Sequence, residues 1–215
     1  AAVKEGQPRA FSARDERIAL IRLGRDLMAQ VGVEGIRAFR AGSFASNADT
    51  YRALHVCGID VDSSLNAVCA DSGPDLRGQL DFTSPQDFEG VRILPMTVFQ
   101  DGTGRQRPAQ LGACSFAELR GALESAKKLG VEHFVLLSHN FEMLKQGRSE
   151  PDAIVVRRFE ALCRYLASQR DRFTVSTMAM LPTSAPAQRA ASLPSAGLPA
   201  TLWRHGEQLA RRFLG

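Results

Sequence analysis

Few of the aromatic residues that stack on nucleic-acid bases are present, since the 215-residue chain has only two Tyr and one Trp. Its 27 Lys and Arg residues are scattered among 23 acidic residues, so the net charge of +4 is not gathered into a basic run. Proteins that bind single strands combine a basic groove with aromatic side chains. Both shortages argue against nucleic acid as a partner.

Long apolar runs are also missing. The longest, such as HFVLL at residues 133–137, fall far short of the roughly 20 residues that a membrane-spanning helix needs. The opening residues AAVKEGQPRAF lack the apolar centre of a signal peptide, and position 1 is not Met, which leaves room for a preceding segment. We therefore expect no transmembrane segment.

Three familiar chemical motifs are absent. The four cysteines, at positions 57, 69, 114 and 163, form no CxxC pair, which argues against a zinc knuckle. No G-x-S-x-G segment is present to supply the nucleophile of an α/β hydrolase. The stretch DGTGR at residues 101–105 lacks the spacing of a phosphate-binding loop and predicts a turn.

Helical and extended patterns alternate along the chain. Helices are expected over residues 12–32, 47–57, 115–130, 152–169 and 201–214. Strands are expected over residues 36–40, 59–63, 91–99, 132–138 and 172–177, with an irregular stretch over 66–90. Such alternation predicts parallel pairing, in a barrel or in an open doubly wound sheet, although Pro95 disfavours an uninterrupted central strand there.

Local signals mark where the helices begin and end. Ser115 with Glu118 forms a capping-box pattern, and Ser12 with Asp15 forms a weaker one. Gly58 is suited to the left-handed position after a helix. The apolar face of the first helix is expected to contain Ile18, Ile21, Met28 and Val31, and that of the helix over 152–169 to contain Ile154, Phe159, Leu162 and Leu166.

Three charged or titratable residues fall at the C-terminal ends of expected strands. Arg40 closes the strand over 36–40, Asp62 lies near the end of the next strand, and His139 follows the strand over 132–138. Because the C-terminal ends of barrel strands carry the chemistry, we expect these side chains to meet at one rim, with Asp62 as an ion-pair partner of Arg40. A structural role remains open, since Arg40 could clamp a loop and a histidine that ends a strand is often only hydrogen-bonded.

Two longer segments resemble a known family. FRAGSFASNADTYRALHVCGIDVDSS at residues 39–64 and FVLLSHNFEMLKQG at 134–147, followed by a helix and FTVSTM, are similar to the polysaccharide deacetylase family, and to its divergent bacterial surface-polysaccharide members. The likeness covers about residues 12–180. It implies an α/β fold, a distorted (β/α) barrel over residues 1–180 with its N-terminal strands missing or replaced, and a Pro/Ala-rich tail with a basic helix over 181–215.

The resemblance also implies roles for individual residues. Arg40 matches the arginine that orients a catalytic aspartate, His139 matches the late catalytic histidine, and Asp62 supports the arginine and the site wall. An aromatic residue expected nearby is replaced by Ser63 and Ser64. The residues expected to bind substrate are Phe39, Gly42, Ser63 and Asn140.

The family's activity is the removal of acetyl groups from sugar polymers. Its members hydrolyse amide or ester bonds with a divalent metal, usually zinc, while an aspartate acts as base and a histidine protonates the leaving group. The resemblance therefore implies a bacterial hydrolase of the cytoplasm or cell envelope whose partner is an acetylated polysaccharide or oligosaccharide.

The family's metal-ligand motifs are missing from this chain. Neither the Thr-Phe-Asp-Asp segment nor the His-x-x-x-His pair occurs, so zinc or another divalent metal is expected only in an intact enzyme, with ligands from outside these residues. Two readings stay open: a fragment of a metal-dependent deacetylase, or a degenerate, non-catalytic carbohydrate-binding barrel that has lost its metal site.

Overall fold

The computed structural model describes residues 14–145, 147–181 and 192–214. These residues fall into two compact units: residues 14–95 with 177–181, and residues 96–176 with 192–214. The division expected from the sequence, a barrel over 1–180 followed by a tail over 181–215, stays a prediction. In the structure one boundary between the two units follows Pro95, and residues 177–181 belong again to the first unit.

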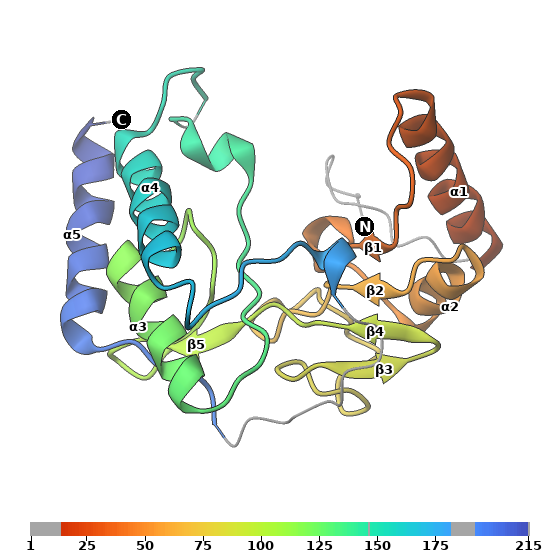
Figure 1. Ribbon diagram of the computed structural model, residues 1–215, viewed down its shortest axis with the longest axis horizontal. Coiled ribbons are helices and arrows are strands. Elements are labelled where there is room, and N and C mark those ends of the chain that lie inside the picture. Colours follow the sequence, from red (N-terminus) through yellow and green to blue (C-terminus); the bar gives the residue numbers. More distant parts are fainter. Residues whose placement is uncertain (1–13, 146, 182–191, 215) are drawn as a thin grey trace, which may run out of the picture. The chain divides into compact units, whose positions relative to one another are not determined.

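The first unit contains a four-stranded sheet with the order β1-β2-β4-β3 (Figure 1). The strands are β1 (Ala38–Phe39), β2 (Val61–Asp62), β3 (Gln86–Phe88) and β4 (Val91–Ile93). β1 pairs with β2 and β2 with β4 in parallel, whereas β3 is antiparallel to β4. The parallel pairing expected for the segments 36–40 and 59–63 is therefore confirmed.

Two helices pack together in this unit. They are α1 (Arg14–Gln30) and α2 (Ala48–Val56). Asn47 caps α2 in a reciprocal capping box with Thr50, and Gly58 has a φ of +71°, as expected after a helix end. The core beneath contains the buried side chains of Tyr51, Leu54, Ile59, Leu65, Leu76, Phe82, Val91 and Ile93.

Short elements complete the first unit. A 3-10 helix, η1, spans Gly42–Phe44 directly after β1, and another, η3, spans Met178–Met180. β3 lies inside the stretch predicted to be irregular. It pairs with β4 because Glu89 and Gly90 both take positive φ values, 49° and 76°, which suits a tight two-residue hairpin.

Three helices and a small sheet form the second unit (Figure 1). α3 (Phe116–Lys128) contacts both α4 (Ala153–Ser168) and α5 (Leu198–Leu214). β5 (Val98–Gln100) and β6 (Gln106–Pro108) pair antiparallel. The capping box of Ser115 and Glu118 is present at α3, and Asp152 caps α4. A 3-10 helix, η2, spans Asn140–Met143.

Two expected strands are wrong. Residues 132–138 form only a single parallel bridge, between Leu137 and Gln110. A few backbone hydrogen bonds join the segment to its neighbours, such as that from Leu137 to Ala109, but the N–H of Val135 donates to the side chain of Thr97. Residues 172–177 pair with no strand among the described residues, and Val175 is 73% exposed. Extended apolar residues form a regular strand only where their backbone pairs continuously with a neighbouring strand.

The strand expected over 91–99 is divided. β4 ends at Ile93 and β5 begins at Val98, and the intervening residues include Pro95. Proline has no N–H to donate to a central strand, so the break falls where the sequence disfavoured continuity. The two halves belong to different units.

Two expected helix faces also differ from the structure. Phe159 is 39% exposed on α4, where Val155 and Arg158 are buried, while Leu162 is buried as expected. In the first helix Met28 is 46% exposed, and Val31 lies beyond the helix end and is 73% exposed. The buried Arg158 pairs with Glu207, a partner that the spacing of apolar residues alone does not predict.

The barrel implied by the family resemblance stays a prediction. Among the described residues the strand pairings give a four-stranded and a two-stranded sheet, which mix with the helices in each unit. Over the same residues, no helix has the length and apolar character needed to cross a membrane.

Candidate functional site

The residues expected to form the site are divided between the two units. Phe39, Arg40, Gly42, Asp62 and Ser63 belong to the first unit, and His139 and Asn140 to the second. The meeting of Arg40, Asp62 and His139 at one rim therefore stays a prediction. Each unit is taken in turn.

Arg40 holds the backbone that follows the neighbouring strand. Its Nε donates to the carbonyl of Ser63 at 3.1 Å, and a terminal nitrogen donates to the Ser63 hydroxyl at 3.0 Å. Burial lowers the pKa of Arg40, while the charge of Asp62 acts in the opposite direction. The expected ion pair is not found: within the described part of the chain no carboxylate lies within salt-bridge distance of Arg40. Arg40 acts as a clamp on Ser63.

Asp62 is fully enclosed at the end of β2. Its carboxylate accepts the backbone N–H of Ser64 at 2.8 Å and the Ser64 hydroxyl at 2.6 Å. Burial raises the pKa of Asp62 to about 6, although hydrogen bonds from Ser64 and Tyr51 act against the rise. The Ser64 hydroxyl accepts the N–H of Ala41 at 2.9 Å, so Asp62 helps to join the loops after β1 and β2.

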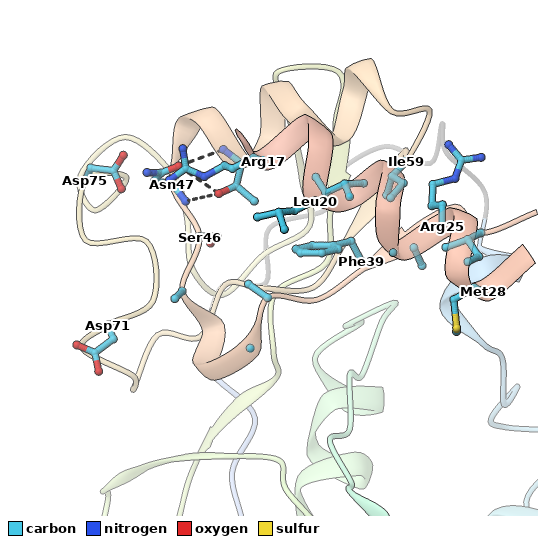
Figure 2. A pocket seen from close by; sticks show the side chains of 18 of the residues that line it. Arg17, Leu20, Arg25, Met28, Phe39, Ser46, Asn47, Ile59, Asp71 and Asp75 are labelled. Atoms are coloured by element: carbon cyan, nitrogen blue, oxygen red, sulfur yellow. Dashed lines mark hydrogen bonds between the residues drawn. The ribbon is translucent and has the colours of Figure 1, made fainter. Parts of the chain in front are cut away.

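Phe39 and Gly42, both expected to bind substrate, line a cavity of about 820 Å³ in the first unit (Figure 2). Figure 2 shows Leu20 of α1 close to Phe39 of β1 inside this cavity. Asp71 and Asp75 lie on one side of it, but most of the lining surface is apolar. The cavity therefore suits a ligand with an apolar body more than a bare sugar.

His139 occupies an ordered position in the second unit, just before η2. Its Nδ1 lies 3.0 Å from Oε1 of Glu142, and its ring stacks on Phe141 with 4.8 Å between ring centres. The side chain of His139 is 43% exposed, whereas that of Glu142 is 10% exposed. A reactive ring is thus accessible while its partner is shielded.

Three nitrogen atoms converge on the carboxylate of Glu142. Besides His139, the side-chain amide of Gln110 donates to Oε1, and the backbone N–H of Gly112 donates to Oε2 at 3.1 Å. A Cβ atom added at Gly112 would lie 2.9 Å from Oε2 of Glu142, so a larger residue there would require this carboxylate to shift. The sequence reasoning missed Glu142, although a histidine and a glutamate three residues apart are a usable signal for a pair across one helical turn.

Asn140 has a local role. Its Oδ1 accepts the N–H of Phe141 at 2.9 Å, and its side chain is exposed. Next to it, Phe141 and Glu142 line a cleft of about 810 Å³ whose other polar residues include Gln110, Lys145, Arg148 and Arg211. The expected substrate residue therefore lies beside an open cleft in the same unit as His139.

The paired imidazole and carboxylate can transfer protons. A histidine oriented by a carboxylate through Nδ1 has its second ring nitrogen available to give or take a proton. Among the described residues Nε2 of His139 has no hydrogen-bond partner. The arrangement matches the requirement that a base be oriented by a third group.

The described residues do not fit the zinc ion that the resemblance implies. No three His, Cys, Asp or Glu side chains among them form a group that could hold a metal ion. A catalytic zinc needs three protein ligands.

Comparisons with known proteins give no indication of function. No family model, curated protein or solved structure matches the chain.

Proposed function

We propose that the chain carries the acid–base group of a hydrolase that removes acetyl groups from a surface or extracellular polysaccharide. The observation that carries this proposal is the His139–Glu142 pair, with Nδ1 3.0 Å from Oε1, beside a cleft of about 810 Å³. The resemblance of residues 134–147 to the segment around the family's catalytic histidine supports the same chemistry.

His139 supplies the proton that the reaction needs. Hydrolysis adds water to the acetyl carbonyl, breaks the carbon–nitrogen or carbon–oxygen bond, and leaves acetate with an amine or hydroxyl on the sugar. The departing nitrogen or oxygen must gain a proton. With Nδ1 engaged by Glu142, the protonated ring donates from Nε2 and is left neutral.

The cleft offers a surface for a sugar ring. Phe141 is 62% exposed, lines the cleft and stacks on His139, so the histidine ring lies next to a residue of the lining. Ligand sites of this size combine aromatic surface with a few placed polar groups. Gln110 and Arg211 supply such groups within the lining.

A second candidate is a non-catalytic carbohydrate-binding protein. The absence of a three-ligand metal group among the described residues favours it, because the related chemistry depends on a metal. In this reading Phe141 and the cleft bind a sugar, and His139 serves only to stack and orient it.

Acetate release separates the two candidates. The protein would be incubated with an N-acetylglucosamine oligomer and with acetylated xylan, with and without added zinc, and free acetate measured. We expect release that His139→Ala lowers by about 10² to 10⁴-fold, the usual contribution of a general acid. Sugar binding in calorimetry without acetate release would favour the binding protein. Equal rates for wild type and His139→Ala would contradict the assigned role of His139.

A further inference from the structure

We propose that Glu142 is the positioning residue of His139: it holds the ring with the proton on Nδ1 and leaves Nε2 for the reaction. The catalytic consequence rests on the proposed function, whereas the effect on the ring can be observed in the protein without substrate. Such a residue does not touch the reacting atoms and acts only through the histidine.

The carboxylate is fixed before any ligand arrives. Oε1 faces both His139 and Gln110, and Oε2 faces the N–H of Gly112. The side chain of Glu142 is only 10% exposed, so water competes little for these bonds. A carboxylate held by several donors has one orientation, and it imposes that orientation on the imidazole.

The peptide of Gly112 is itself anchored from the opposite side. Its carbonyl oxygen accepts from Arg158 and from Arg211, each at 3.4 Å. Arg158 pairs with Glu207 at 2.7 Å, and Arg211 pairs with Asp152 at 2.7 Å. Two ion-paired arginines thus fix residue 112, whose N–H donates to Glu142.

The backbone N–H of Gly112 gives the proposal a sharp test, because it can only donate. In Glu142→Gln the new amide oxygen must face Gly112, and the new NH₂ group then faces His139 and Gln110, whose side-chain amide turns its oxygen to accept. Nδ1 of His139 then has to accept instead of donate, and the ring proton moves to Nε2. A substitution of almost equal size is therefore expected to reverse the tautomer.

Ring-nitrogen NMR of the full chain reads the tautomer directly. At a pH where the ring is neutral, we expect the Nδ1–H form for wild type and the Nε2–H form for Glu142→Gln. Gly112→Ala, which crowds Oε2, should shift the ring signals away from the wild-type form. Glu160→Gln changes an exposed glutamate of α4 and should leave the His139 signals unchanged. A wild-type Nε2–H ring, or one tautomer in both wild type and Glu142→Gln, would overturn the proposal.

A double-mutant cycle on acetate release supplies the kinetic test. Glu142→Gln should lower kcat about 10-fold or more with little change in KM, since it misplaces a proton without removing sugar contacts. In a His139→Ala background the same change should have almost no further effect, because Glu142 acts through the ring. Additive losses in kcat would contradict the positioning role of Glu142. Glu142→Asp keeps a carboxylate on a shorter side chain. It should restore the Nδ1–H form of His139 only if that carboxylate still reaches Nδ1.

Failure of the proposed function gives a different pattern. If no acetate is released by any variant while the tautomer reverses as expected, the deacetylase assignment is wrong and the positioning of His139 by Glu142 stands. If acetate is released and depends on His139 but the tautomer does not respond to Glu142→Gln, the function stands and the positioning role falls.

Discussion

The carboxylate of Asp62 is completely buried. Burial raises its pKa from 3.8 to about 6, so the folded protein binds this proton more tightly than the unfolded chain does. The free energy of unfolding therefore falls as pH rises from about 4 to about 6, by up to about 1.4 kcal/mol per pH unit from this group. Above that range Asp62 is charged in both states and its contribution becomes constant.

Asp62→Asn should remove this part of the pH dependence. The amide keeps an oxygen for the N–H of Ser64 and carries no proton that titrates in this range. We expect the free energy of unfolding, measured in urea between pH 4 and pH 7, to fall less steeply than in wild type. Asp60→Asn alters a carboxylate that is 41% exposed and should preserve the wild-type slope. An unchanged slope in Asp62→Asn would show that Asp62 titrates normally.

α5 is attached to the second unit largely through charge. Arg204, with a side chain 4% exposed, donates to Glu118 at 2.9 Å and to Asp101 at 3.3 Å. Both carboxylates are almost completely buried, whereas apolar residues of the same helix such as Trp203 are exposed. Buried ion pairs add little net stability, but removal of one partner leaves an unpaired charge that is costly.

Arg204→Ala should destabilise the protein by about 3–5 kcal/mol, because it leaves Glu118 and Asp101 buried without their cation. Chemical denaturation at neutral pH measures the loss. Arg212→Ala removes the same type of side chain from an exposed position on the same helix and should change stability by less than about 0.5 kcal/mol. Comparable losses in both variants would mean that the ion pairs of Arg204 contribute nothing beyond helix propensity.

Helices were predictable and strands were less so, for a physical reason. The capping of α2 by Asn47 and of α3 by Ser115 depends on residues within one turn, so the local sequence specifies it. A strand exists only when a distant segment pairs with it. The stretch over 132–138 has the apolar character of a strand, yet one of its backbone N–H groups goes to the side chain of Thr97.

The sequence was sufficient to predict His139 but not the residues that hold its side chain in place. His139 could be proposed from its place after an apolar stretch and from the family resemblance. The contact of Glu142 with His139 depends on the turn of η2. The contact of Gly112 with Glu142 depends on the fold, which brings residues thirty positions apart within hydrogen-bond distance. Pro95 indicated the break between β4 and β5, but not that the two strands belong to different units.

The capacity for zinc is a property of the chain as a whole, since three ligands must be gathered from it. The described residues contain no such group. The remaining positions, 1–13, 146, 182–191 and 215, include a single candidate ligand of the Asp, Glu, His or Cys type, Glu5. A catalytic zinc site uses three protein ligands and binds only when these are deprotonated and positioned. We therefore predict that the purified 215-residue chain retains far less than one zinc per molecule after equilibrium dialysis at neutral pH, as measured by elemental analysis.

His139→Ala should retain the same small amount, because a lone histidine contributes only weak surface binding. Stoichiometric zinc that is lost in His139→Ala would contradict the prediction and would make His139 a metal ligand instead of the proton donor assigned to it.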